Sequence, residues 1–446
     1  MLTSSMNQEN HDTHSRTPIG NTDFRNKRTS FYIKDKDRLS HMYVCGKSGV
    51  GKSTLLLNMV IADIKNGKGI AVLDPHSDLA EELLHHIPKE RINDVVYFNP
   101  SDLDFAVAFN PLKGIHPDFH HLVASSLIST FKKIWIDSWG PRMEHILRFS
   151  LFALLEYPDG TLLDIQPLLT DKGFRETVLS HVQNQDTRSF WFNEFDKFSP
   201  TMRAEAVSPI LNKLDLFLTS IPLKNTVGQK TRGFRIQQIM DEGKIFIANL
   251  SKGKMGEDAC ALLGCMLVTS FQMATLHRAR QPEHSRRPFF LSIDEVHTFA
   301  TLSFVDILSE SRKFGLGLYM SSQFLNQLDP RILAAIFGNV ATLVAFRVGS
   351  EDAATLAKEF YPTFSEWDLV HLPRYSMYLK LMIDGATSKP FNATTHALPK
   401  RETSHKETIT MLSNSKYAKP RAEVEKDLLA HRFHRHPGNG QAPLFN

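Results

Sequence analysis

The sequence predicts an α/β fold with a mainly parallel sheet flanked by helices and an inserted, mostly helical domain. Short apolar, β-prone runs alternate with helical periodicity in two separate parts of the chain. Between those parts, from about residue 119 to 226, helical periodicity dominates. The chain has 446 residues, which is enough for two to three domains.

Each expected element follows from its local pattern. The run Met42-Tyr43-Val44-Cys45 is apolar and β-prone, and it leads into a glycine loop and then a helical period that Asn66-Gly67 ends. The same rhythm of strand and helix returns after the insertion. We expect strands at 42–45, 69–74, 94–98, 244–250, 288–294, 316–321, 342–348 and 377–383, and helices at 54–65, 79–86, 142–155 and 257–279.

The domain boundaries follow from changes in these patterns. Residues 1–30 are polar and aperiodic, so we expect them to be disordered. The α/β core is expected at 31–118 and 227–395, with the all-helical insertion at 119–226 between its halves. The polar, basic stretch 396–446 is expected to be a flexible tail.

Composition restricts the cellular context. The three cysteines, Cys45, Cys260 and Cys265, show no paired spacing, which favours a reducing compartment. No stretch approaches ~18 uninterrupted apolar residues, and residues 1–30 lack an apolar signal core. We therefore expect a cytoplasmic protein that does not insert into a membrane. The net charge of +4 permits a nucleic-acid partner without requiring one.

The glycine loop matches the pattern G-x-x-x-x-G-K-[ST] between an expected strand and an expected helix. Its backbone N–H groups can surround phosphate oxygens, and the following helix directs its N-terminal dipole at them. We expect Lys52 to neutralise the β and γ phosphates of ATP and the Ser53 hydroxyl to ligate Mg²⁺. The predicted nucleotide-binding residues are Gly46, Lys47, Ser48, Gly49, Val50, Gly51, Lys52, Ser53 and Thr54.

Two adjacent acids end a later apolar strand, in the run Phe289-Phe290-Leu291-Ser292-Ile293-Asp294-Glu295. We expect Asp294 to hold Mg²⁺ and Glu295 to polarise the attacking water. Alone, this pair would be read as a strand end with two solvated acids. Together with the upstream loop it predicts an ATPase that carries its own catalytic glutamate.

Two further residues are candidates for the same reaction. Gln323 ends the next strand and can reach the γ-phosphate as a sensor. Arg312 precedes that strand and could act as an arginine finger in a neighbouring subunit. A surface ion pair between Arg312 and Glu310 is an equally good interpretation.

Two other loops are open to both a functional and a structural interpretation. The run Asp74-Pro75-His76-Ser77-Asp78 follows a strand at the expected nucleotide edge, but it could simply form a turn and a helix cap. The basic run 251–256 could contact DNA phosphates or could be a solvated loop.

With these motifs, the chain resembles the P-loop ATPases of the HerA/FtsK superfamily, and most closely the conjugative coupling proteins of the TraG/TraD kind. The resemblance covers about residues 31–395. It implies a RecA-like P-loop NTPase core, a ring that is usually a hexamer, and movement of DNA through its centre. It also implies that the insertion corresponds to the all-alpha domain of coupling proteins. The runs that carry it are 46–55, 73–79, 110–112, 139–144, 249–253, 293–295 and 312–323.

The chain departs from this pattern at its N-terminus. Coupling proteins usually carry N-terminal transmembrane helices and HerA carries an N-terminal β-barrel, and neither is encoded here. A smaller difference is Ser77, where this superfamily often has glycine.

Three functions remain open on the sequence alone. The first is an ATP-driven DNA translocase of conjugative transfer and type IV secretion, with a possible membrane-bound secretion partner. The second is a HerA-like DNA-processing or defence ATPase that works with a separate nuclease. The third is a regulatory or protein-translocating ATPase.

Overall fold

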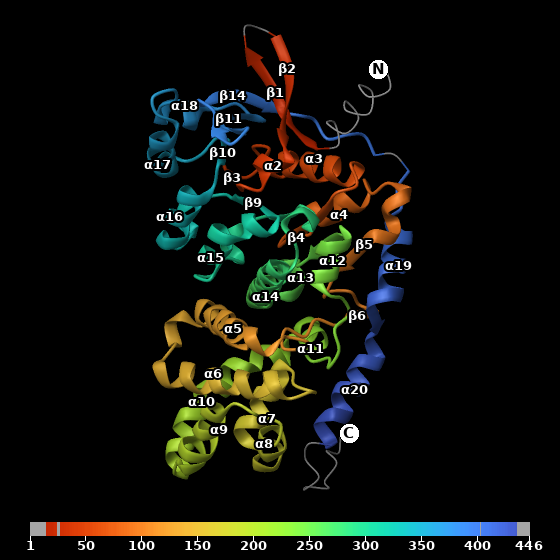
Figure 1. The fold of residues 1–446 in the computed structure, drawn as a ribbon, viewed down its shortest axis with the longest axis vertical. Helices are drawn as coiled ribbons and strands as arrows, with labels where there is room; N and C mark the ends of the chain where they lie inside the picture. The colour runs from red at the N-terminus through yellow and green to blue at the C-terminus, as the bar shows by residue number, and fades with distance from the viewer. Residues whose placement is uncertain (1–14, 25–26, 402, 435–446) are drawn as a thin grey trace. The chain divides into compact units, whose positions relative to one another are not determined.

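The computed structural model describes residues 15–24, 27–401 and 403–434, and it divides the chain into two compact units. The first unit draws on residues 1–98, 235–251 and 270–413, and the second on 99–234, 252–269 and 414–446. The elements of both units are labelled in Figure 1.

The first unit is built on an 11-stranded sheet with the strand order β2-β1-β14-β11-β10-β3-β9-β8-β4-β7-β5. The strands from β10 to β5 in this order run parallel, whereas β11, β14, β1 and β2 add an antiparallel extension beside β10. This confirms the predicted fold class. The strands are β1 (Arg16–Phe24), β2 (Lys27–Lys34), β3 (Met42–Cys45), β4 (Gly69–Asp74), β5 (Val95–Phe98), β7 (Ile245–Asn249), β8 (Phe289–Ile293), β9 (Leu316–Ser322), β10 (Thr342–Ala345), β11 (Ser376–Lys380) and β14 (Phe391–Thr395).

Helices cover both faces of this sheet, which explains why its central strands are apolar throughout. On one face, α3 packs its buried side chains against Ile70 and Val72 of β4. Phe246 of the neighbouring strand β7 points to the opposite face, because successive residues of a strand alternate between the two faces. The centre of its ring lies 5.8 Å from that of Phe271 in α14. The helices of this unit are α2 (Asp35–Arg38), α3 (Lys52–Lys65), α4 (Asp78–Leu84), α12 (Ile236–Glu242), α15 (Phe304–Glu310), α16 (Pro330–Asn339), α17 (Ser350–Phe360) and α18 (Glu366–His371), while α14 (Glu257–His277) and α19 (Lys406–Tyr417) continue into the second unit.

Within the described residues, the segment Glu257–Arg280 is long and apolar enough to cross a membrane by length and composition alone. However, 78% of its apolar window is buried inside the protein. A helix that packs against a sheet in this way has the apolar surface of a core helix, so its hydropathy is explained by the fold.

The second unit is mostly helical, and it contains all of the predicted insertion at 119–226. Its boundaries are wider than predicted, because it also takes in the chain from residue 99, the segment 252–269 and the end of the chain. A short antiparallel pair joins β6 to β15. Its elements are β6 (Phe105–Val107), α5 (His120–Ile134), α6 (Pro141–Glu156), α7 (Ile165–Thr170), α8 (Lys172–Leu179), α9 (Gln185–Ser189), α10 (Pro200–Thr219), α11 (Ile221–Val227), α13 (Lys252–Met255), β15 (Ala418–Pro420) and α20 (Arg421–His434).

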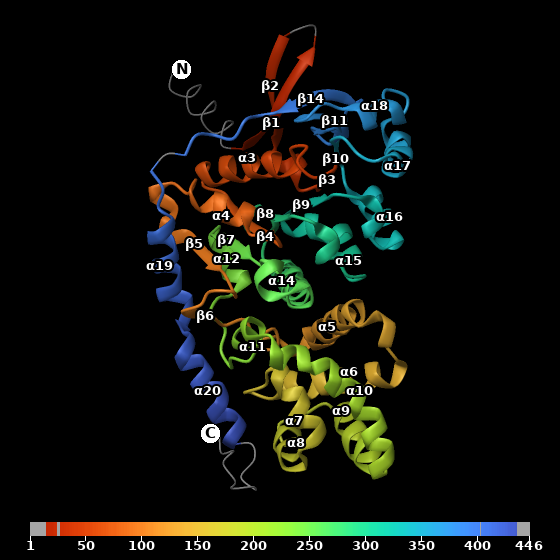
Figure 2. The same ribbon diagram turned by 180° about the vertical axis from the view of Figure 1, so that it is seen from behind.

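The structure corrects the expected disorder of residues 1–30 for the part that it describes, whereas residues 1–14 and 25–26 lie outside the described residues. The hairpin of β1 and β2 joins the sheet through β14, as Figures 1 and 2 show. Thr17 of β1 is buried and donates to Asp63 of α3 at 2.7 Å. These partners lie far along the chain, so local composition could not reveal them.

The structure also corrects the expected flexible tail at 396–446. Helices α19 and α20 occupy much of it, and residues 435–446 lie outside the described residues. Ile409 is fully buried, and Ser413 accepts a hydrogen bond from the backbone N–H of Tyr97 at 2.8 Å. A few anchoring contacts therefore order a stretch whose overall composition is polar.

Candidate functional site

The glycine loop lies between β3 and α3, as its motif requires. Gly49 and Gly51 have φ values of 73° and 125°, a conformation that favours glycine. A Cβ on Gly51 would lie 3.0 Å from the Tyr375 ring and 3.1 Å from the Phe346 ring, so both rings would have to give way to a side chain there. The residues from Gly46 to Thr54 thus form one loop and the first turn of a helix. The N–H groups of Gly46 and Lys47 donate to the carbonyls of Ser322 and Arg347, so the N–H groups from Ser48 onward are the ones that an anion can use.

Lys52 lies folded over this loop. Its ammonium donates to the carbonyl oxygens of Gly46 at 2.6 Å and Lys47 at 3.1 Å. The side chain is buried, and burial lowers the pKa of Lys52, although the nearby charges of Glu295 and Asp294 act in the opposite direction. The lysine is therefore placed at the cradle and electrostatically coupled to both acids.

Asp294 follows directly after β8. Its carboxylate accepts a hydrogen bond from Ser321 in the neighbouring strand β9. Burial raises the pKa of Asp294, and the Ser321 hydrogen bond opposes that shift. Burial of this kind is tolerated where a carboxylate has a fixed partner or a cation to bind.

Glu295 has a left-handed backbone, with φ 48° and ψ 61°. Its Oε2 accepts from the backbone N–H of Gln323 at 3.3 Å and lies 3.4 Å from Nδ1 of His297. Burial acts to raise the pKa of Glu295, but His297 and Lys52 outweigh it, so the pKa is lowered overall. A buried carboxylate that stays ionised at neutral pH, on strained backbone, has the properties of a functional group.

The strand order explains why these residues meet. Strand β9 lies between β3 and β8, and all three run parallel. Their carboxyl ends share one edge of the sheet, where ligands bind in open α/β folds. The loop, the acids and half-buried Gln323 are thus brought together as predicted.

Arg312 is not at that edge. It lies in a short helical turn, Ser311–Phe314, that precedes β9, and its side chain is exposed. The seven residues of β9 lie between Arg312 and Gln323, and a strand of that length spans about 20 Å. Arg312 therefore lies at the opposite edge of the sheet from the loop of its own chain.

His41 holds the segment that carries Arg312. Its Nε2 donates to the Leu308 carbonyl at 3.1 Å, and its Nδ1 accepts from the Leu318 N–H at 3.1 Å. Only one neutral tautomer satisfies both partners. Burial lowers the pKa of His41 to about 4, and the charge of Arg312 contributes in the same direction.

This burial predicts a stability loss in mild acid. Between pH 6.5 and pH 4 the unfolded chain binds a proton at His41 and the folded chain does not, so acid favours unfolding. We expect His41 to remove roughly 3 kcal/mol of stability over this range. Urea unfolding midpoints at several pH values measure it. The His41→Asn variant, whose side chain tolerates the φ of 65°, should lose that part of the pH slope. An unchanged slope would contradict the assignment.

The Asp74 loop has a structural explanation. Asp74 is buried and accepts from the backbone N–H groups of His76 and Ala80, both at 2.8 Å. Asn249 of β7 donates to Ser77 at 2.9 Å. Asp74 thus caps the turn before α4, which favours the turn-and-cap interpretation of this run.

Sequence reasoning missed two residues that contact the loop. Arg374 donates through Nε to the Gly49 carbonyl at 2.9 Å, and Tyr375 donates through its N–H to the Val50 carbonyl at 2.8 Å. They belong to no motif and lie more than 300 residues from the loop. Only the pairing of β11 beside β10 brings them there, so no local signal could have found them.

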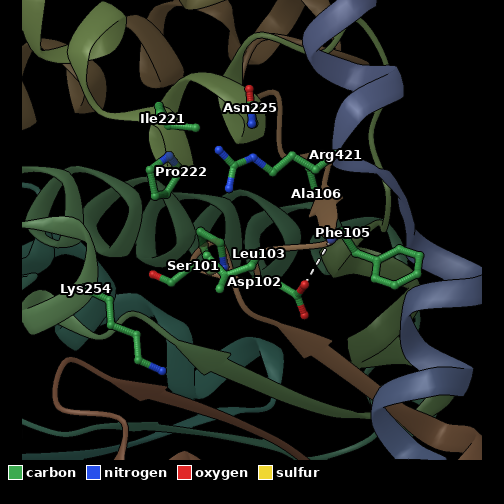
Figure 3. Close-up of a pocket in the computed structure, with 11 residues that line it drawn as sticks. Ser101, Asp102, Leu103, Phe105, Ala106, Ile221, Pro222, Asn225, Lys254 and Arg421 are labelled. Atoms are coloured by element: carbon green, nitrogen blue, oxygen red, sulfur yellow. Dashed lines mark hydrogen bonds between the residues drawn. The ribbon is translucent and has the colours of Figure 1, made fainter.

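The second unit has a cavity of its own, of about 400 Å³, shown in Figure 3. Exposed Leu103 and Ile221 line it, and the Arg421 side chain reaches across it from α20. Arg421 donates to Glu425 at 2.7 Å, and Asn225 donates to the same carboxylate oxygen at 3.1 Å. The cavity contains none of the predicted site residues, all of which lie in the first unit.

A protein-family model matches most of this chain. Residues 30–363 match the model described as the type IV secretion-system coupling protein DNA-binding domain. The chain belongs to this family of coupling proteins. The family match confirms the resemblance predicted from the motifs, and it supports a conjugative, DNA-translocating motor of type IV secretion as the function.

Solved structures share the fold of this coupling protein. The bacterial conjugative coupling protein TrwBΔN70 is 14% identical with a TM-score of 0.61, and the match covers 87% of this chain and 93% of that chain. TrwB in complex with ADP and Mg²⁺ is 15% identical with a TM-score of 0.61, covering 83% and 89%. VirB4 of Thermoanaerobacter pseudethanolicus is 15% identical with a TM-score of 0.58, covering 86% and 97%. A comparison with curated protein sequences found no match.

Proposed function

We propose that this coupling protein hydrolyses ATP and uses the energy to move DNA through a ring of its own copies. The observation that carries the proposal is the ionised and oriented carboxylate of Glu295. Its carboxylate is kept ionised by His297 and Lys52 and is oriented by the backbone N–H of Gln323, at the same sheet edge as the phosphate loop. An ionised, oriented carboxylate beside a phosphate cradle is suited to act as a general base on water.

The residues divide the reaction between them. The loop N–H groups and Lys52 bind the phosphates, and Lys52 exchanges its carbonyl partners for phosphate oxygens. As the water oxygen attacks the γ-phosphorus, Glu295 accepts the proton, and the bond from that phosphorus to the ADP oxygen breaks. We assign Gln323, whose backbone N–H holds Glu295, to contact the γ-phosphate and sense its loss.

Ser53 and Asp294 fit a bound Mg²⁺. The Ser53 side chain is exposed at the start of α3, and the Asp294 carboxylate is buried at the adjacent strand end. Magnesium prefers oxygen ligands of this kind, completed by water and substrate phosphates. When bound, the ion neutralises charge on the phosphates.

The ring follows from Arg312. Because this residue lies at the sheet edge away from its own loop, it can stabilise transition-state charge only in a neighbouring copy. A closed ring, taken here as a hexamer, gives every copy one such neighbour. We propose a cytoplasmic motor that works with DNA and with a membrane-bound secretion partner.

One experiment tests this function. ATP turnover is measured with no DNA, with single-stranded DNA and with double-stranded DNA, alongside native mass. We expect DNA to raise turnover and the active species to be a closed oligomer. A monomer whose turnover ignores DNA would contradict the proposal and would favour a regulatory or protein-translocating ATPase.

A further inference from the structure

The loop between α18 and β11 rests directly on the phosphate-binding loop. Two hydrogen bonds join them, from Arg374 to the Gly49 carbonyl at 2.9 Å and from the Tyr375 N–H to the Val50 carbonyl at 2.8 Å. A third hydrogen bond holds Tyr375 to the sheet, because the Thr395 N–H in β14 donates to the Tyr375 carbonyl at 3.0 Å. The backbone of Tyr375 is thus held from both directions.

This anchoring keeps Tyr375 in an unfavourable conformation. Its φ is 66°, in the left-handed region that a bulky side chain rarely adopts. Such strain costs about 1 kcal/mol or more and persists only where the surroundings enforce it. Here the enforced conformation aims an aromatic side chain at the nucleotide loop.

The ring lies beside the phosphate cradle and remains accessible. Its Cδ1 is 3.0 Å from the place that a Cβ on Gly51 would take, and the residue is 39% exposed. The guanidinium of Arg374 lies 4.8 Å from the centre of the same ring. The nearby Phe346 is fully buried, so of the two rings beside Gly51 it is Tyr375 that a ligand can reach.

We propose that Arg374 and Tyr375 form the platform for the purine base and ribose of the bound nucleotide. This inference rests on the proposed ATP binding and names the base subsite of the same site. An aromatic ring and a guanidinium both recognise the flat face of a base. Neither reads its hydrogen-bonding edge in this arrangement, so adenine and guanine nucleotides should bind with similar affinity.

The test compares three probes by calorimetry: ATP, GTP and inorganic tripolyphosphate, which has no base. Tyr375→Asn removes the ring and keeps a residue that tolerates positive φ. We expect it to weaken ATP and GTP binding about ten-fold and to leave tripolyphosphate binding unchanged. Tyr375→Phe should retain wild-type affinity for all three, and Arg374→Ala should weaken ATP more than tripolyphosphate. Tyr32→Asn, the same change at an exposed tyrosine of β2, serves as the matched control.

Two results would overturn the platform. In the first, Tyr375→Asn binds ATP as the wild type does. In the second, it loses ATP and tripolyphosphate equally, which would mean that Tyr375 only shapes the loop. Failure of the wild type to bind ATP at all would instead refute the proposed function, so the two failures are distinguishable.

Discussion

Replacing Glu295 with glutamine is expected to lower ATP turnover by about 10² to 10⁴-fold while ATP affinity stays close to wild type. The amide keeps the shape of the side chain and can still face the N–H of Gln323, but it cannot accept a proton from water. Nucleotide binding depends on the loop and on Lys52, which this change does not remove. Phosphate release measures turnover, and calorimetry measures affinity.

Glu407→Gln is the matched control for this variant. Glu407 is exposed on α19, away from every proposed site residue, so the same chemical change there should leave turnover unchanged. Normal turnover in Glu295→Gln would refute its role as the base. A loss of ATP binding in that variant would place Glu295 in binding rather than in chemistry.

Lys52→Ala is expected to abolish measurable nucleotide binding, with an affinity loss of roughly 100-fold or more. The change removes a buried cation from the cradle and leaves the carbonyls of Gly46 and Lys47 without their donor. Lys65→Ala, at the exposed last turn of the same helix, controls for loss of a lysine from α3. Retained binding in Lys52→Ala would contradict the assignment of the loop.

The Lys52 variant also tests Arg312. A mixture of Lys52→Ala and Arg312→Ala subunits contains interfaces where an intact loop faces an intact arginine. If Arg312 acts in a neighbouring copy, the mixture should hydrolyse ATP faster than either variant alone. No gain on mixing would favour the surface interpretation of Arg312.

The parts of the structure that depend on local chemistry could be predicted. The glycine loop between β3 and α3, and the acids that end β8, each follow from a short run with a physical reason for its spacing. The buried parallel strands were equally clear, because helices on both faces make them apolar throughout.

The parts that depend on distant partners could not be predicted. Strand β1 contributes buried Thr17 and Ile19 and pairs with a strand near residue 394, and nothing near residue 20 reveals this. Helix α19 is ordered by Ile409 and Ser413 in a polar stretch. Arg374 and Tyr375 reach the site through the order of the strands, which a single sequence does not display.

The placement of Arg312 across the sheet from its own loop has a consequence for regulation. If Arg312 completes the site of a neighbouring copy, as we propose, a lone subunit would carry the parts of two half-sites but no complete one. If hydrolysis needs both halves, unassembled copies cannot hydrolyse ATP, however high the ATP concentration. ATP hydrolysis would then begin only when the ring assembles, and whatever nucleates that assembly would also activate the motor.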